Sequence, residues 1–319
     1  KADGTLWGWG TNDRGILGTN HPAVLGTSVV SNDSYYYGYP NQVMKGDNTP
    51  LTDVISVSAG ENFALAADAE GRLWILGDYH TWHVSTQHAT YWYFEYYNYA
   101  RQLSVPAGRK VVQVAAGLDV GLALLDNGTV IHVYNRQAFN YYDTSTGYLT
   151  TVNGRDYHNI YERVANVGGV LTNAAGGTSE ARVLDRVVKV AVYGSTMMAL
   201  RTDGSVVSLG LQTLTGNAGS PTRVANPGQN DDGQFGIGTT TPSGQWTYVP
   251  TYMVKDAGMT GRPDDVYVRA VTDIDVGSTA SLLITRDDKV YTAGNHNYGG
   301  QTGLDYLLPG EVTGGWNRP

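Results

Sequence analysis

Apolar and polar residues alternate in short runs along this chain, and the same arrangement of runs returns several times. The opening segment DGTLWGWG, residues 3–10, places a turn dipeptide before an alternating apolar stretch. Related segments stand at 70–77, 127–134, 203–210 and 287–294, and in all five the last residue lies six positions after the turn residue. Short alternating runs that follow Gly, Asn or Asp predict β-hairpins rather than helices.

Four of these hairpins follow an apolar run that ends in glycine, here called the anchor strand. The anchor glycines are Gly60, Gly117, Gly194 and Gly277, and the next turn residue follows 11, 11, 10 and 11 positions later. The turn glycines are Gly4, Gly71, Gly128 and Gly204; glycine accepts the positive φ of a tight turn. We therefore expect repeat hairpins near 3–10, 61–77, 118–134, 195–210 and 278–294.

A unit of three or four antiparallel strands cannot bury both of its own faces. Radial stacking solves this problem and leaves only short edges, which is the solution of the β-propeller. The predicted fold class is therefore all-β: a β-propeller of radially arranged four-stranded antiparallel blades, with five repeats visible and long loop insertions. We expect a single domain over 1–319 that is an excerpt of a longer chain, because no anchor strand precedes Gly4. A ring with an open or differently filled seam is the alternative.

The repeats resemble those of the regulator of chromosome condensation family. That family has an Ala-Gly anchor, an Asp-Gly turn, a strand ending Trp-Gly, and then Asn-x-x-Gly-Gln-Leu-Gly. The matching positions in this chain are Trp9, Gly10, Asn12, Gly15, Leu17 and Gly18, with a second match in GQNDDGQFGIG at 228–238. The resemblance implies a propeller, typically of seven blades, most like the bacterial and phage extracellular members. No segment matches the residues with which eukaryotic members exchange nucleotide on a small GTPase.

Composition and charge narrow the range of partners. Charged residues make up 16% of the chain and its formal net charge is −8. A nucleic-acid partner would need a basic stripe, so none is expected. Cysteine is absent, which excludes disulfides and thiolate metal sites. No apolar run approaches the ~20 residues that span a bilayer, so we expect no membrane insertion.

Tyrosine is concentrated in the long insertions that follow the repeat hairpins. They hold 20 of the 23 tyrosines, with the densest runs at 34–40 and 91–99. Tyrosine combines a large flat ring with a polar tip and suits binding surfaces. The candidate binding residues are Tyr35, Tyr36, Tyr37, Tyr39, Trp82, Tyr91, Trp92, Tyr93, Tyr96, Tyr97, Tyr99, Tyr141, Tyr142, Trp246 and Tyr248. Structural cover of the blade edges is the alternative role.

No catalytic or metal-binding group is expected. His80, His83 and His88 are close in sequence, but zinc needs three or four converging ligands, and we interpret them as loop histidines. The tandem acids at 231–232, 264–265 and 287–288 sit at turns, where aspartate makes local hydrogen bonds. Glycosidases instead need two carboxylates that face each other across a sugar. We therefore predict no metal, no cofactor and no enzymatic activity.

Together these features predict a non-enzymatic recognition or assembly module. We expect it on a virion, as a phage tail fibre or receptor-binding component, or on a bacterial cell surface. Its partner would be a protein or a cell-surface glycan, and a homo-oligomer would also occupy the tyrosine-rich segments. Two alternatives remain: an intracellular scaffold or guanine-nucleotide exchange factor-like protein, and a polysaccharide-degrading propeller enzyme.

Overall fold

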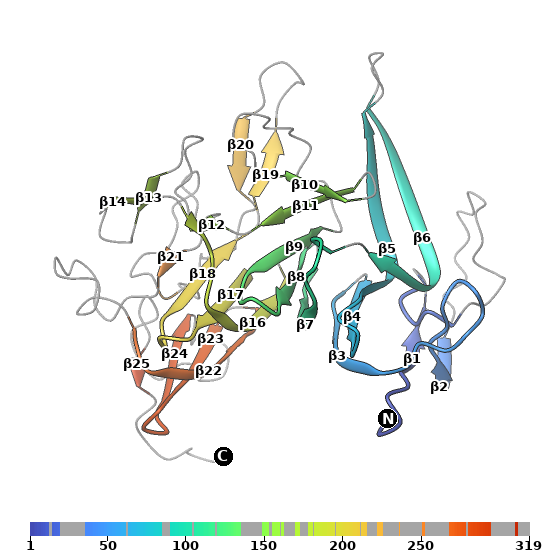
Figure 1. Cartoon of the computed structure of the whole chain (residues 1–319), viewed down its shortest axis with the longest axis horizontal. Helices are drawn as coiled ribbons and strands as arrows, with labels where there is room; N and C mark the ends of the chain where they lie inside the picture. Colours follow the sequence, from blue (N-terminus) through green and yellow to red (C-terminus); the bar gives the residue numbers. More distant parts are fainter. Residues whose placement is uncertain are drawn as a thin grey trace. The chain divides into compact units, whose positions relative to one another are not determined.

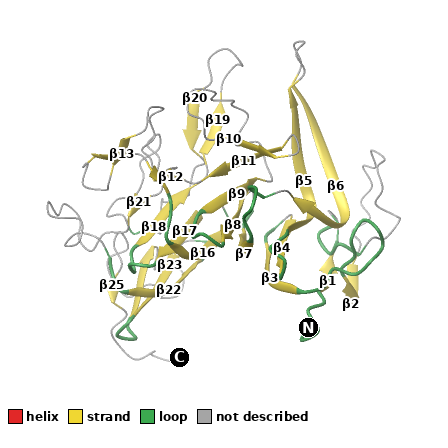
Figure 2. Ribbon diagram, in the orientation of Figure 1, coloured by secondary structure: helices red, strands yellow, loops and turns green. Residues whose placement is uncertain are grey.

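The computed structural model of the chain consists of β-strands joined by turns and loops (Figure 2). It describes residues 1–12, 15–19, 36–61, 63–84, 90–103, 105–118, 120–134, 149–152, 155–159, 161–162, 170–172, 178–180, 182–194, 196–210, 212–215, 222–225, 236, 251–252, 268–278, 280–294 and 310–311. No α-helix occurs within these ranges. Accordingly, the described residues include no helix that is long and apolar enough to cross a membrane.

The chain divides into two compact units, which are described separately. The first unit comprises Lys1–Asn127 and Ile131–His158, and the second comprises Gly128–Val130 and Asn159–Pro319.

The described residues of the first unit form one strand pair and two larger sheets. The pair is β1 (Trp7–Thr11) and β2 (Tyr36–Gln42). One sheet runs in the order β3 (Val54–Ala59), β4 (Phe63–Asp68), β5 (Leu73–Val84) and β6 (Thr90–Leu103). The other runs β7 (Val111–Ala116), β8 (Val120–Leu125), β9 (Val130–Tyr134), β11 (Arg155–Asn159) and β10 (Leu149–Val152). Figure 1 shows β5 and β6 as a long ribbon that extends beyond β3 and β4.

The described residues of the second unit form two four-stranded sheets and three short strand pairs. The first is β16 (Val187–Tyr193), β17 (Thr196–Arg201), β18 (Val206–Gly210) and β21 (Thr251–Tyr252). The last blade is β22 (Val271–Val276), β23 (Ala280–Thr285), β24 (Val290–Gly294) and β25 (Gly310–Glu311). Short pairs join β12 (Tyr161–Glu162) to β15 (Arg182–Val183), β13 (Val170–Thr172) to β14 (Thr178–Glu180), and β19 (Gln212–Thr215) to β20 (Thr222–Ala225).

All four anchor strands share one irregularity in register. The pairing with the following strand shifts between Val54 and Ser56 in β3, and at the corresponding place in β7, β16 and β22. Such a bulge inserts one unpaired residue and increases the local twist of the strand. Residues at equal distances from the bulge are therefore equivalent from blade to blade, which allows their burial to be compared position by position.

The hairpin turns also share one contact with the segment that leads into the next anchor strand. The carbonyl of Gly204 accepts a hydrogen bond from the N–H of Val271 at 3.1 Å, and Gly4, Gly71 and Gly128 accept the equivalent bond from Val54, Val111 and Val187. Gly204 has φ +76°, and a Cβ there would lie 2.6 Å from the backbone nitrogen of Ala270. Only glycine fits both the backbone conformation and this close approach.

The core of each unit lies between neighbouring sheets. In the first unit Leu65, Ala67 and Leu73 pack with Val111 and Val114 in one buried cluster. In the second unit the residues at the same positions do the same, in a cluster that includes Met198, Leu200, Val206, Val271, Ile274 and Val276. Both clusters place an anchor strand against the two middle strands of the preceding sheet.

The predicted all-β fold class of four-stranded antiparallel blades is confirmed. The five turn residues, Asp288 included, all have positive φ. The fourth strand of each blade comes from the insertions rather than from the repeated pattern, as in β6, β11, β21 and β25. The prediction of one domain over 1–319 is not tested by the division into two units.

Candidate recognition surface

An irregular strand pair presents aromatic rings to solvent in the first unit. Gly8 pairs with Asn41 and Gly10 with Tyr37, so between these pairs Trp9 faces the three residues Gly38, Tyr39 and Pro40. A bulge of this kind interrupts the ladder and redirects side chains. Trp9 is 63% exposed and Tyr39 is 69% exposed. The register therefore brings two large exposed rings to the same place on one ribbon.

The neighbouring tryptophan shows what a structural ring does in this segment. The indole N–H of Trp7 donates to the hydroxyl of Thr5 at 2.8 Å, and the Lys1 ammonium lies 3.6 Å from the centre of its ring. Thr5 in turn donates to Asp3 at 2.6 Å, and this bond lowers the pKa of the Asp3 carboxyl. Trp7 is thus fastened to the turn around Gly4, whereas the Trp9 ring is open to solvent.

Trp9 occupies a position that is buried in other blades. Gly10, Gly77 and Gly294 each have positive φ and each lies six positions after the turn residue of its hairpin. The residues just before the last two, Leu76 and Ala293, are 2% and 1% exposed. The sequence places Trp9 in a repeat strand, and it was not among the candidate binding residues.

The β5–β6 ribbon carries the densest of the predicted aromatic runs. Its register places Trp82 directly opposite Trp92, with Tyr91, Tyr93, Tyr96 and Tyr97 at other paired positions of β6. Directly opposed residues in an antiparallel pair lie on the same face of the ribbon. Position 82 and position 92 therefore share one face.

The remaining predicted aromatic residues fall into three groups. Tyr36 and Tyr37 lie in β2, opposite Thr11 and Gly10. Tyr99 is half-buried, and its ring lies where a Cβ at Gly46 would meet it at 2.8 Å, so it packs within the first unit. The positions that lie outside the described residues are Tyr35, Tyr141, Tyr142, Trp246 and Tyr248.

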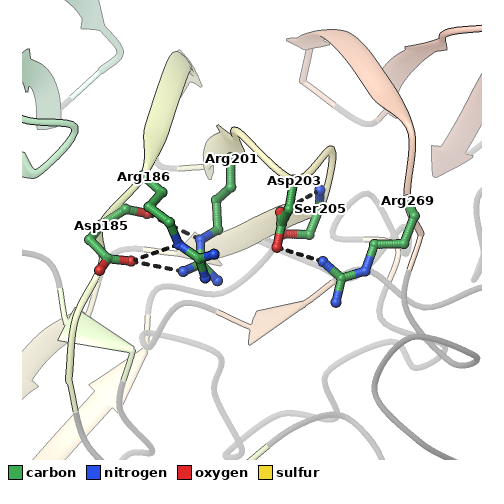
Figure 3. A network of polar contacts seen from close by, with 6 residues as sticks. All are labelled: Asp185, Arg186, Arg201, Asp203, Ser205 and Arg269. Carbon is green, nitrogen blue, oxygen red and sulfur yellow. Dashed lines mark hydrogen bonds and ion pairs between the residues drawn. The ribbon is translucent and has the colours of Figure 1, made fainter.

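A cluster of polar side chains in the second unit connects turns to the segments that precede the anchor strands (Figure 3). The buried Arg201 donates to the carbonyl of Asp185 at 3.1 Å and to its carboxylate at 2.9 Å, and Arg186 also lies 3.5 Å from that carboxylate. Arg269 donates to Asp203 at 2.7 Å. Each carboxylate in this cluster pairs with a guanidinium, as is typical of ion pairs that stabilise a fold.

The hydrogen bonds of Asp203 set its protonation. Its carboxylate accepts from the backbone N–H of Ser205 at 3.0 Å and from the Ser205 hydroxyl at 2.5 Å. Burial works to raise the pKa of Asp203, but these bonds and the charge of Arg269 outweigh it and lower the pKa to about 2. Asp203 is therefore ionised at neutral pH and unsuited to act as a general acid there.

The sequence analysis also singled out turn aspartates and three histidines, and the structure describes several of them. Asp287 accepts from the hydroxyl of Thr285 at 2.6 Å, as expected of a turn aspartate. His80 and His83 lie within strand β5 rather than in a loop, and His88 lies outside the described residues. Within the part of the chain that the structure describes, no group of three or more His, Asp or Glu side chains could hold a metal ion.

Three of the four anchor glycines close the turn between the first two strands of a blade. The N–H of Gly60 donates to the carbonyl of Phe63 at 2.8 Å, and Gly117 and Gly277 make the same bond to Val120 and Ala280. Gly194 differs, because it has φ +56°.

Comparison with known proteins supports the class of protein that these blades define. The family model for the regulator of chromosome condensation (RCC1) repeat matches residues 3–67, which confirms the expected resemblance to this repeat. The expected likeness to bacterial and phage members stays a prediction. The chain is similar to human WBSCR16, with 17% identity and a TM-score of 0.56 over 97% of this chain and 67% of that one. This likeness shows the fold, a β-propeller type built from repeated blades.

Two yeast structures are similar over the whole chain at a lower level. Yeast RCC1 (Prp20), solved with Kap60, has 17% identity and a TM-score of 0.43 over 98% of this chain and 71% of that one. Prp20p from Saccharomyces cerevisiae has 17% identity and a TM-score of 0.43 over 100% of this chain and 76% of that one. No curated protein sequence matches the chain.

Proposed function

We propose that the protein is a non-enzymatic recognition module that binds a protein or glycan partner through the aromatic surface of its first unit. The observation that carries this proposal is the exposure of Trp9 and Tyr39 at one bulge of β1–β2. Exposed aromatic rings that lie together on a rigid ribbon offer large contact area at low cost in side-chain entropy. The β5–β6 ribbon, with its further aromatic positions, extends the same unit.

The surroundings of the two rings favour a partner that is not strongly charged. Tyr39 stands beside Gly38 and Pro40, and its own carbonyl accepts the amide N–H of Asn41 at 2.9 Å. Uncharged rings with amide and hydroxyl groups nearby stack on the apolar face of a sugar or fill an apolar recess of a protein.

The setting of this recognition is a further part of the proposal. A surface with few charges, many tyrosines and no cysteine motivates a place outside the cell, on a virion or a bacterial surface. Immunogold labelling of the intact source particle or cell tests this point, and label confined to the cell interior would contradict it.

Binding is tested with the double variant Trp9→Ala, Tyr39→Ala on a glycan array and on candidate host cells. Loss of both rings should weaken binding at least tenfold, about 1.4 kcal/mol, because central aromatic side chains dominate interface energies. The matched control is Tyr193→Ala, which removes an exposed tyrosine from the second unit. Unchanged binding by the double variant would remove the aromatic surface as the site.

The RCC1 repeat match at 3–67 favours a second candidate function, that of an intracellular scaffold or exchange factor. Nucleotide release from small GTPases, measured with a fluorescent GDP analogue, separates the two. Acceleration by the native protein and by the Trp9→Ala, Tyr39→Ala variant alike would favour this candidate over recognition through the aromatic surface.

A further inference from the structure

The repeat hairpins differ at the residue that precedes the turn residue. Four hairpins carry an acid there and the hairpin between β8 and β9 carries an amide; the five residues are Asp3, Glu70, Asn127, Asp203 and Asp287. Asn127 is exposed to solvent and is followed directly by Gly128. The β8–β9 turn therefore presents an Asn-Gly pair to water.

An asparagine side chain reacts with the backbone nitrogen of the residue that follows it. That nitrogen attacks Cγ of the amide, and a side chain on the attacking residue hinders its approach. Glycine has no Cβ and adopts the widest range of backbone conformations, so it meets the least hindrance and strain. Gly128 has φ +78°, so this turn already uses that freedom. The residue after Asn127 is therefore the one that most favours attack on the Asn127 amide.

The acids at the same position of two other hairpins are protected from this reaction. Hydrogen bonds from the hydroxyl and the N–H of Thr5 lower the pKa of the Asp3 carboxyl. Burial works to raise the pKa of Asp203, but its hydrogen bonds from Ser205 help to lower it to about 2. Both carboxyls are ionised at neutral pH, and an ionised carboxylate repels a nucleophile. The uncharged amide of Asn127 is therefore the most reactive of the three side chains.

Asn48 shows how a different neighbour suppresses the same chemistry. Asn48 is also exposed and also lies in a turn, in which its N–H donates to the carbonyl of Lys45 at 3.0 Å. The next residue is Thr49, whose β-branched side chain crowds its own backbone nitrogen. The N–H of Thr49 also donates to Asp47 at 3.0 Å, so this nitrogen already has a partner in the folded chain. Asn48 is therefore an exposed internal control.

Gly128 is also the residue through which this turn contacts the anchor strand β16. Its carbonyl accepts the N–H of Val187 at 2.9 Å, and both residues belong to the second unit. A Cβ at Gly128 would lie 3.2 Å from the backbone of Arg186. The main chain at Gly128 therefore has little room to shift without losing this hydrogen bond.

We propose that Asn127 is a site of spontaneous deamidation, and that the isoaspartate formed there weakens the contact between Gly128 and β16. Isoaspartate adds one carbon atom to the main chain between positions 127 and 128. This addition moves Gly128 relative to Val187 and Arg186. The modification needs no partner other than water, and it is independent of the aromatic surface on the first unit.

The reaction proceeds through a cyclic imide. The backbone nitrogen of Gly128 loses its proton and forms a bond with Cγ of Asn127, while the bond between Cγ and Nδ2 breaks and Nδ2 leaves, with that proton, as ammonia. Water then opens the ring at one of its two carbonyls. Cleavage of the new bond to Cγ gives aspartate, and cleavage of the original peptide bond gives isoaspartate. No atom changes its oxidation state, so no oxidant or reductant is needed.

The test incubates the full chain at 37 °C and pH 8 and follows it by tryptic digestion and mass spectrometry. Cleavage after Lys110 and Arg136 separates Asn127 from the second Asn-Gly pair of the sequence, at 153–154. Deamidation at Asn127 should be faster than at Asn48 by about tenfold or more. Methylation by protein isoaspartate methyltransferase measures the isoaspartate, and the urea midpoint of the chain should fall as its share rises.

Two variants separate the reaction from its consequence. Asn127→Gln retains the amide but would have to close a larger ring, so it should escape deamidation at this position and keep its urea midpoint during incubation. Asn127→Asp introduces the charge without the extra main-chain atom, as at Asp3 and Asp203, and should match the midpoint of the fresh native chain. Circular dichroism of each variant establishes that it folds.

Each part of the proposal has an outcome that would overturn it. Equal rates at Asn127 and Asn48 would remove Asn127 as a preferred site. An unchanged midpoint of the deamidated native chain, or an equal loss in incubated Asn127→Gln, would contradict the effect on β16. A midpoint of Asn127→Asp as low as that of the deamidated chain would assign the loss to the charge rather than to the main chain.

Discussion

The second unit contains two blades built on one pattern that differ in what lies against them. The sheet β16–β18 has its middle strands covered by β22, and all six residues of β17 are buried. The last blade has the same bulge, the same hairpin and the same strand order, yet residues of β23 alternate between buried and exposed. The two blades therefore differ in the burial of the second strand: β22 packs against β17, whereas Leu282 and Ile284 of β23 are 42% and 39% exposed.

This difference distinguishes the features that a repeat forms by itself from those that require a neighbouring repeat. The bulge of the anchor strand and the register between the second and third strands are equal in both blades, so they are internal to the repeat. Burial of the middle strand requires the next anchor strand. A stacked repeat therefore gains much of its stability from the interface rather than from the blade itself.

The largest effect should come from shortening equivalent side chains in the two blades. Leu200→Ala should cost about 3 kcal/mol, because it removes a fully buried side chain and leaves a cavity beside β22. Ile284→Ala should cost about 1 kcal/mol or less, because its side chain already contacts water. Urea unfolding followed by circular dichroism measures both. Equal costs would mean that the Ile284 side chain is buried in solution.

Substitutions at the turn residues Gly204 and Asp288 compare the two blades through their backbone conformation. Gly204→Ala should cost about 2 kcal/mol, because it places a Cβ at positive φ and against Ala270. Asp288→Gly should change stability by less than about 0.5 kcal/mol, because relief of its backbone conformation is offset by entropy of the unfolded chain. Thermal unfolding of the two variants beside the native chain provides the measurement. A large loss in Asp288→Gly would show that Asp288 makes an important native contact.

The sequence predicts the repeated part of this molecule because local rules determine it. Spacing from anchor glycine to turn glycine is set by strand length and turn type, so Gly60, Gly71 and their counterparts predict the hairpins. The fourth strand has no such signature. β21 and β25 are only two residues long, and they pair with the free edges of β18 and β24. Strands this short leave no periodic pattern in the sequence from which they could be predicted.

The candidate surface was harder to predict for the same reason. Tyrosine enrichment drew attention to 34–40 and 91–99, and the structure places Tyr39 in solvent but packs Tyr99 against Gly46. Composition does not distinguish a ring that contacts a partner from one that covers its own chain. Trp9 illustrates the converse, because it lies in a repeat strand outside the tyrosine-rich segments and is nevertheless 63% exposed.

The smallest effect should come from the charges at the two turns, and it depends on pH. Asp203, in the turn between β17 and β18, has its pKa lowered to about 2, and Arg269, which precedes β22, is one of its partners. Because the folded pKa lies below the unfolded value, the stabilisation is complete above about pH 4 and is lost as the pH falls toward 2. Asp203→Asn should therefore cost about 1 kcal/mol at pH 7, a value reduced by solvent screening, and almost nothing at pH 2.

The control for this prediction is Asp287→Asn in the last blade, between β23 and β24. Its carboxyl pKa is also lowered, first by the hydroxyl of Thr285, but its cation is the exposed Lys289 of its own hairpin at 3.9 Å. Among the residues that the structure describes, no neighbouring segment contributes an arginine to Asp287. The Asp287→Asn variant should therefore lose less stability than Asp203→Asn at pH 7. Urea midpoints at pH 7, 4 and 2.5 measure both variants. Equal losses at pH 7 would show that the local turn hydrogen bonds, rather than the contact with the next blade, account for the stabilisation.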